Sequence, residues 1–172
     1  FYTVGENQDS LCCWLEMNKD CRQHFGSISG DSVYKFGLFQ CKETGVWTTG
    51  SPQKPQELTE EEALVIGRNI RDALVKGARI IADASLNSLE AYEILEDTLK
   101  AEVGSQYYNW GWFHKYYSII FHDKLCGFHS TDWQVHVLRA LHIKPSDKYY
   151  ARSGQIAMIQ NYTEWYYRQF FD

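Results

Sequence analysis

The sequence predicts an α+β fold, in which a small antiparallel β-sheet from the N-terminal third packs with about five α-helices. Two observations lead to this prediction. Short apolar and aromatic runs bounded by Asp, Asn, Gly and Ser occupy the first third of the chain, whereas apolar residues at helical spacing fill the rest. A group of strands followed by a group of helices is typical of folds that segregate the two. The 172 residues suit one domain, with a β-rich part at 1–56 and a helical part at 57–172.

Two segments of the first third are predicted to be strands. Residues 11–17 and 33–41 are short, rich in apolar or aromatic side chains, and bounded by turn-forming residues. Residues 26–30 between them add a small strand or a wide turn. Residues 45–55 hold two of the three prolines together with Gly and Ser, so we expect a surface connection there.

A long helix is predicted to begin after Thr59. Thr59 and Glu62 have the spacing of a capping box, and the acids of this first turn suit the positive end of the helix dipole. Apolar or small residues then recur every three or four positions, with charged residues on the other side. The stripe consists of Ala63, Ile66, Gly67, Ile70, Ala73, Leu74, Gly77 and Ile81.

Four further helices are expected. Ser88 can cap the next one, whose buried face would comprise Leu89, Tyr92, Leu95, Leu99 and Val103. Three more helical segments follow near residues 113–121, 130–142 and 153–171, and Ser153 can cap the last of them.

Charge is distributed unevenly along the chain. The formal net charge is −5, but residues 1–103 hold 10 Lys and Arg against 17 Asp and Glu, whereas residues 104–172 hold 7 against 5. Nucleic-acid affinity depends largely on cations that neutralise phosphates. Only the C-terminal part is therefore suited to face phosphate.

The cysteines and the apolar runs of the sequence indicate in which cellular compartment the protein is expected. Five cysteines at irregular spacing among apolar neighbours are typical of reduced thiols, which favours the cytoplasm. No apolar run reaches the length of a membrane span, so no membrane partner is expected. The chain begins with Phe1 and ends at Asp172 directly after an aromatic run, and we expect it to be a piece of a longer protein.

Motifs for catalysis are absent from the sequence. It has no Walker A motif, no Gly-x-Gly-x-x-Gly turn and no Gly-x-Ser-x-Gly elbow, and its acids cluster on solvent-facing helix positions. We therefore expect that this segment is not an enzyme and that it binds no cofactor.

One group of metal-ligand residue types leaves two readings open. His122, Cys126 and His129, with Cys21 and His24, could hold zinc or could be ordinary core and surface side chains. The irregular spacing favours the second reading, and no metal site is predicted. Nucleophilic catalysis by Cys126 with His129 is the weaker possibility, since no orienting group accompanies them.

Aromatic residues concentrate in the last third, where 18 of the 27 lie between Tyr107 and Phe171. Tyr and Trp carry polar atoms that need partners once buried, so this density indicates rings placed to meet a ligand. Near Tyr149 and Tyr150, Arg152 beside a helix start capped by Ser153 would make an anion site with stacking faces. The alternative is that both tyrosines pack internally and Arg152 pairs with an acid from the N-terminal half.

The chain resembles the N-terminal region of McrB-type restriction proteins, AAA+ GTPases that cut DNA carrying modified cytosine with a partner nuclease. The resembling blocks cover most of the chain. They are Tyr34-Lys-Phe-Gly37, Thr59-x-x-Glu62-Ala63, Ile70-Arg71-x-Ala73-Leu74, His114-Lys115-Tyr116 and Tyr149-Tyr-Ala-Arg-Ser-Gly-Gln155.

This resemblance implies a DNA-binding domain of an antiviral restriction system. Its partners would be double-stranded DNA with modified cytosine, an AAA+ motor and a nuclease subunit. Readers of this kind flip the target base into an aromatic cage. The candidates for the cage are Trp110, Trp112, Tyr116, Tyr117, Tyr149 and Tyr150. The candidates for phosphate contacts are Lys115, Lys144, Lys148, Arg152 and Ser153.

A second hypothesis is a protein-interaction module that docks on other subunits of a defence complex. The acidic net charge and the aromatic crowding of residues 165–171 favour it. Trp133 and Trp165 lie among apolar residues at helical spacing, and we expect both to pack in the core.

Overall fold

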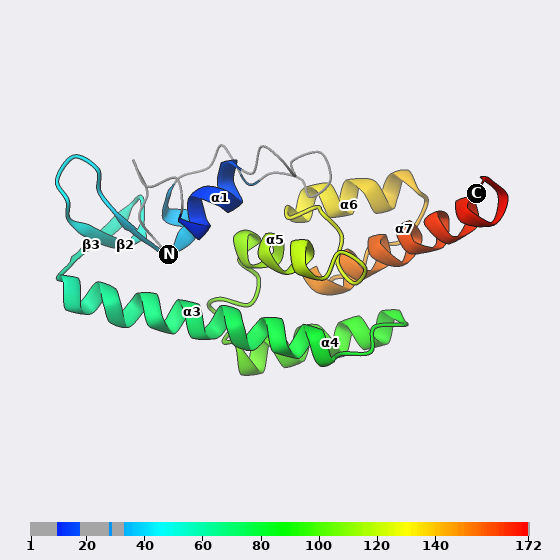
Figure 1. Cartoon of the computed structure of the whole chain (residues 1–172), viewed down its shortest axis with the longest axis horizontal. Coiled ribbons are helices and arrows are strands. Elements are labelled where there is room, and N and C mark those ends of the chain that lie inside the picture. The colour runs from blue at the N-terminus through cyan, green and yellow to red at the C-terminus, as the bar shows by residue number, and fades with distance from the viewer. Residues whose placement is uncertain (1–9, 18–27, 29–32, 172) are drawn as a thin grey trace.

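The computed structural model describes residues 10–17, 28 and 33–171, with side chains as far as residue 165. This part of the chain has a three-stranded antiparallel sheet and six α-helices, which confirms the predicted α+β class (Figure 1). The strands are β1 (Leu38–Gln40), β2 (Trp47–Ser51) and β3 (Lys54–Leu58). The helices are α1 (Leu11–Met17), α3 (Glu60–Asp83), α4 (Leu89–Glu102), α5 (Gly111–Ile120), α6 (Thr131–Ala140) and α7 (Tyr149–Phe171).

Most of the sheet lies where a surface connection is predicted. β2 and β3 form an antiparallel hairpin in which Ser51 pairs with Lys54, and β1 pairs with the other side of β2. Pro52 occupies the two-residue turn, and Pro55 lies in β3, an edge strand that tolerates the missing N–H group. The prediction for residues 45–55 is therefore wrong.

The segment at residues 11–17 is a helix rather than the predicted strand. In α1, Cys12 and Leu15 are buried, and the Ser10 hydroxyl accepts a hydrogen bond from the Cys13 backbone N–H. An apolar run of this length does not distinguish a short helix from a strand. Contact with α5 stabilises the helical form.

Only the second half of the segment at 33–41 is a strand. Val33–Phe36 forms a 3-10 turn, labelled η1, and Leu38–Gln40 forms β1. Gly37 between them has a φ of 76°, which allows the chain to change direction. The expectation for residues 26–30 lies outside the described residues, apart from Ile28.

The predicted starts of α3 and α4 are confirmed. Thr59 Oγ1 accepts a hydrogen bond from the Glu62 N–H at 3.2 Å, and Glu62 Oε2 accepts one from the Thr59 N–H at 2.8 Å, which completes the capping box. Ser88 caps α4 through the Ala91 N–H. Leu89 is exposed, contrary to its expected place on the buried face.

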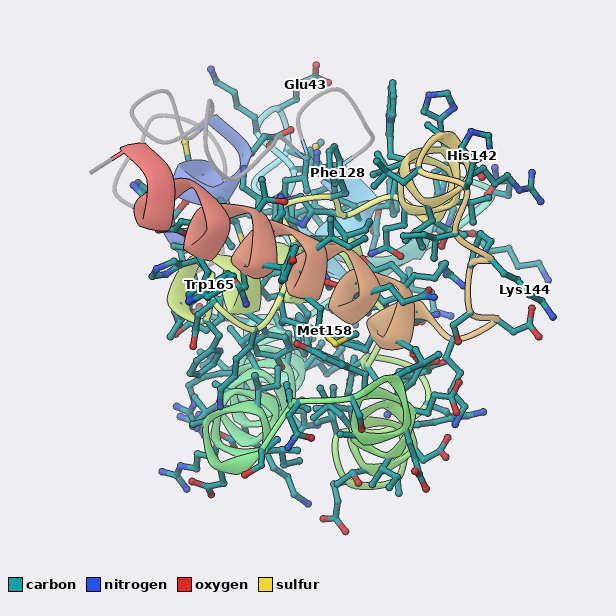
Figure 2. All side chains as sticks on the ribbon, turned by 90° about the vertical axis from the view of Figure 1, so that its right-hand side faces the viewer. Glu43, Phe128, His142, Lys144, Met158 and Trp165 are labelled. Carbon is teal, nitrogen blue, oxygen red and sulfur yellow. The ribbon has the colours of Figure 1, made fainter. Side chains whose placement is uncertain are left out.

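The helices form two layers. α3 and α4 lie side by side in one layer, α5 and α7 cover them, and α6 packs on the outer side of α7 (Figures 1 and 2). The end of α3 is held by Lys124, whose ammonium group donates hydrogen bonds to the carbonyls of Ile81, Ala82 and Ala84 at 2.9–3.0 Å. A cation at this end also suits the helix dipole.

Aromatic side chains make much of the core between these layers. Two glycines allow rings to reach helix backbones: a Cβ atom at Gly77 would overlap the Tyr117 hydroxyl, and one at Gly154 would overlap the Tyr92 ring. The largest fully buried side chains of the layers are Trp112, Tyr92, Tyr117, Tyr150, Phe113, Lys115, Ile70, Leu74 and Ile81. None of the described helices is both apolar enough and long enough to span a lipid bilayer.

Candidate functional site

The structure sorts the six predicted cage rings into two groups. Four of them, Trp112, Tyr117, Tyr149 and Tyr150, are buried, and the three tyrosine hydroxyls bond to backbone carbonyls at 2.8–3.1 Å. These tyrosines satisfy their polar atoms inside the protein. Trp110 and Tyr116 are only half-buried. The six rings do not form one open cage.

The predicted phosphate contacts are also largely engaged inside the fold. Lys115 is fully buried, and its ammonium group donates to the Leu15 carbonyl at 2.6 Å, which ties α5 to α1. Lys148 pairs with Asp97 at 2.7 Å. Lys144 is exposed and reaches away from the body (Figure 2).

Arg152 fastens the loop that precedes α7. Its guanidinium donates to the carbonyls of Ser146 and Asp147 at 3.0 Å, and more weakly to Gln134 Oε1 and Thr131 Oγ1 at 3.3 Å. The side chain is therefore used for structure. Its nearly complete burial leaves little of it for a ligand.

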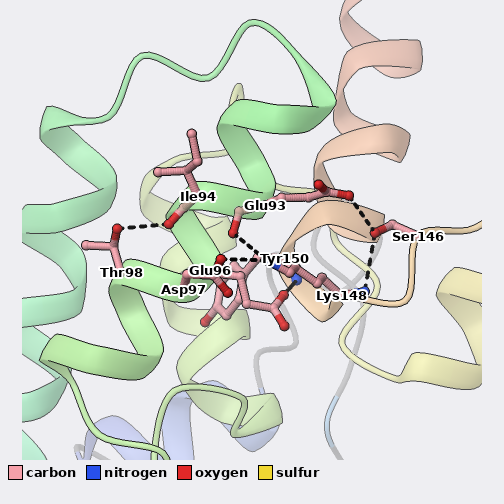
Figure 3. Close-up of polar contacts among 8 residues, drawn as sticks. All are labelled: Glu93, Ile94, Glu96, Asp97, Thr98, Ser146, Lys148 and Tyr150. Atoms are coloured by element: carbon pink, nitrogen blue, oxygen red, sulfur yellow. Dashed lines mark hydrogen bonds and ion pairs between the residues drawn. The ribbon is translucent and has the colours of Figure 1, made fainter.

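The anion site predicted at Ser153 is wrong because α7 begins four residues earlier, at Tyr149. The N–H group of Tyr150 lies in the first turn of α7, where it has no carbonyl partner within the helix. It donates a hydrogen bond to the Glu96 carboxylate at 2.6 Å (Figure 3). Burial raises the pKa of Glu96, while the Tyr150 N–H and the charge of Arg152 act to lower it. A carboxylate from α4 thus fills the place that an external anion would take.

Ser153 instead belongs to a buried polar chain. The Ser153 hydroxyl lies 2.8 Å from His114 Nε2 and accepts the Cys126 N–H at 3.1 Å, and His114 Nδ1 lies 2.9 Å from His129 Nδ1. Burial keeps the pKa of His114 well below its usual value, and the charge of His129 lowers it further. A neutral His114 can link His129 to Ser153 in either tautomer.

Cys126 is not set up as a nucleophile. Burial raises the pKa of its thiol, although the hydrogen bond from Ser153 acts in the opposite direction. A reactive cysteine needs a lowered pKa and access to substrate, and Cys126 is buried. The arrangement favours a structural role for this thiol.

No group of three or more His, Cys, Asp or Glu side chains within the described residues is close enough to hold a metal ion. Cys21 and His24, the other suggested ligands, lie outside those residues. Two members of the set, Cys126 and His129, are instead hydrogen-bonded to Ser153 and His114, respectively.

A pocket of about 790 Å³ lies beside the start of α5, between β2 and α3. Its volume falls within the range of about 300–1,000 Å³ that is usual for small-molecule sites. Two of the predicted cage rings, Trp110 and Trp112, line it together with Tyr34 and Tyr107. Tyr149 and Tyr150, at the start of α7, do not line this pocket.

Trp110 is fixed at the edge of this pocket. Its indole lies against the backbone of Gly37, where a Cβ atom would overlap the ring. Edge-to-face contacts with Tyr107 and Phe113, at centroid distances of 5.0 and 5.5 Å, hold its orientation. A ring that is half-buried and held on three sides is ready to stack on a flat ligand.

Two polar groups of the pocket lining are available. The side chains of Asn109 and Ser130 are exposed, and neither has a hydrogen-bond partner among the residues that the structure describes. Lys35, which brings a full positive charge to the lining, forms a salt bridge with Glu16 at 2.8 Å. Its ammonium group also donates a hydrogen bond to the Ile28 carbonyl. The pocket therefore suits a flat, uncharged ligand with hydrogen-bonding edges.

Sequence reasoning missed Tyr34, Tyr107, Asn109 and Ser130 as pocket residues. Tyr107 and Asn109 flank the aromatic run on which the prediction rests, so the run itself was a signal. Tyr34 and Ser130 are distant in sequence from Trp110, and only the fold brings them together.

Two tryptophans expected in the core are exposed. Trp133 on α6 and Trp165 on α7 are 60% and 56% exposed. Trp133 contacts His136 one turn later, and Trp165 contacts Tyr162. The neighbours of Trp133 that are buried, Gln134 and Leu138, lie on the opposite side of α6.

Comparison of the chain with family models, curated proteins and solved structures finds no match.

Proposed function

We propose that this chain is a non-catalytic DNA-binding domain that accepts a single base, with modified cytosine as the candidate, in the pocket beside α5. The observation that supports this most is the fixed Trp110 ring beside the available Asn109 and Ser130 side chains. A base taken out of the stack would find an aromatic face and partners for its hydrogen-bonding edge.

The chemistry of the pocket favours a base over a phosphate. A nucleobase is flat and uncharged, and each base stacked on an aromatic side chain contributes about 1–3 kcal/mol. The lining residues hold no unpaired full charge that would attract a phosphate. Phosphates must then be bound outside this pocket.

The proposal extends to the setting of the domain. Because the chain resembles the N-terminal region of McrB-type proteins, we place it in a modification-dependent restriction system, in which a separate motor and nuclease would act on the DNA. The cytoplasm is the matching compartment. Cys12, Cys13, Cys41 and Cys126 form no disulfides with one another, as expected for reduced thiols.

Affinity for short DNA duplexes with and without a modified cytosine tests the proposal. We expect binding by the unmodified chain, a preference for the modified duplex, and loss of that preference in Trp110→Leu. Trp165→Leu, which changes an exposed indole far along α7, serves as the matched control and should keep the preference. Absence of binding to either duplex at low salt would contradict the proposal.

Protein docking is the second candidate, because the C-terminal end of α7 extends beyond the other helices (Figure 1). Tyr162 and Trp165 on this end are mostly exposed and in contact with each other. Size-exclusion chromatography accompanies the binding assay: a monomer that binds DNA makes docking secondary, whereas self-association without DNA binding favours docking.

A further inference from the structure

Helix α6 presents an exposed face with aromatic and basic side chains. Trp133, His136 and Arg139 are all exposed on it, and the Trp133 and His136 rings meet edge to face at 5.7 Å. Asp132 at the first turn is the acid on this face. These exposed side chains do not take part in core packing, because α6 packs against α7 through its buried residues Gln134 and Leu138.

Cations converge where this face ends. A depression of about 330 Å³ is lined by Arg139 from α6, by Lys144 and Asp147 from the segment that follows, and by Arg152 from α7. Arg139 and Lys144 form no salt bridge or side-chain hydrogen bond in the part of the chain that the structure describes. Both charges are exposed and available to a ligand, beside the buried charge of Arg152.

The face is continuous with the aromatic pocket. His129 and Ser130 line that pocket, and Thr131 is the first residue of α6. A helix of ten residues is about 15 Å long, which corresponds to about four base pairs along the axis of a duplex at a rise of about 3.4 Å each. One strand could therefore have a base in the pocket and phosphates near the end of α6.

We infer that the solvent face of α6, formed by Trp133, His136 and Arg139, binds the phosphate backbone of DNA together with Lys144 of the following segment. This inference rests on the proposed function and gives it the phosphate contacts that the pocket lacks. Lys115 and Ser153 are engaged inside the fold and Lys148 is paired with Asp97 at the surface, so of the predicted lysines this surface keeps Lys144. Arg139 and Lys144 bind phosphates directly, Arg152 adds positive charge beneath them, and Trp133 offers a stacking face.

The test is the salt dependence of DNA affinity in the double variant Arg139→Gln/Lys144→Gln. Loss of two phosphate contacts should weaken binding roughly tenfold for each contact at 0.1 M salt. It should also make the negative slope of log K against log salt less steep, by about 0.9 for each contact. Both modified and unmodified duplexes should be affected equally, since phosphates carry no sequence information.

The matched control is Arg79→Gln/Lys100→Gln. It removes the same charge from exposed positions on α3 and α4, in the layer opposite α6 (Figures 1 and 2). Its affinity and slope should stay near those of the unmodified chain. Thermal unfolding of both double variants checks that these surface changes leave the fold intact.

The remaining outcomes separate the two proposals. If the α6 double variant behaves like the control while Trp110→Leu still loses the preference for modified DNA, the inference about α6 is overturned and the base pocket stands. If the unmodified chain binds no DNA at low salt, the proposed function fails and the α6 surface fails with it.

Discussion

His114 shows how polar side chains of the C-terminal part are used inside the fold. It is completely buried and hydrogen-bonded through both ring nitrogens, to His129 and Ser153. A neutral ring satisfies both contacts, whereas a protonated ring would place a charge in the interior without a carboxylate partner in this chain of contacts. The folded state therefore disfavours protonation of His114.

This burial predicts a pH dependence of stability. The pKa of His114 is lowered in the folded state, whereas the unfolded chain has the ordinary value of 6.5. The contribution of neutral His114 to the free energy of unfolding is complete above pH 6.5. It is lost as the pH falls below this value, because only the unfolded state takes up the proton. The loss reaches up to about 1.4 kcal/mol for each pH unit.

Denaturant unfolding between pH 7.5 and 5.5 measures this effect. His114→Gln keeps hydrogen-bonding groups but cannot titrate, so its free energy of unfolding should fall less over this range. His136→Gln, at an exposed position of α6, should keep the slope of the unmodified chain. Equal slopes for all three proteins would show that His114 does not carry the dependence.

At the level of elements, close contact between α4 and α7 depends on a glycine. Gly154 allows the Tyr92 ring to lie against the α7 backbone, and the Tyr92 hydroxyl donates to the Lys124 carbonyl at 2.6 Å. Tyr92 is buried and held at both ends, so it cannot move aside easily. Gly154 is therefore needed for packing although it lowers helix propensity.

Gly154→Ala should destabilise the protein by about 1–3 kcal/mol, since overpacking in the core outweighs a gain of about 1 kcal/mol in helix propensity. Gly111→Ala at the start of α5 is the matched control. A Cβ atom there meets the His129 carbonyl at 3.6 Å, an ordinary contact, so we expect a change within about 0.5 kcal/mol. Thermal or denaturant unfolding decides, and an unchanged or raised stability in Gly154→Ala would contradict this packing.

The elements differ in how far sequence predicts them. The start of α3 is predicted from Thr59 and Glu62, which lie three residues apart in the sequence, and the structure confirms this start. The start of α7 depends on Glu96, a carboxylate from another helix, so a local pattern pointed to Ser153 instead. Residues 11–17 and 45–55 were misassigned because their length and prolines suit more than one structure.

The same distinction applies to the candidate site. The abundance of rings near Trp110 predicted an aromatic site, and Trp110 lines the pocket. Which rings are buried depends on contacts between helices, such as Tyr150 with the Tyr108 carbonyl and Tyr117 with the Leu74 carbonyl. Composition alone carries no information about those contacts.

On the scale of the whole molecule, the two proposed binding surfaces would bind different parts of the same DNA, the pocket a base and the α6 surface the phosphates. The pocket beside α5 has rings and uncharged polar groups, and the end of α6 has available cations. Most acidic residues lie in the first 103 residues, many of them on α3 and α4 in the opposite layer. Negative charge on that side would orient a polyanion toward α6.

The most direct test of the base pocket is an NMR titration of the tryptophan indole N–H signals with a free modified cytidine, which lacks a phosphate backbone. The signal of Trp110, assigned through Trp110→Phe, should move saturably, whereas those of the exposed Trp14 and Trp165 should stay. If the Trp110 signal stays fixed at millimolar nucleoside, or if only the exposed tryptophans respond, the pocket does not accept a base.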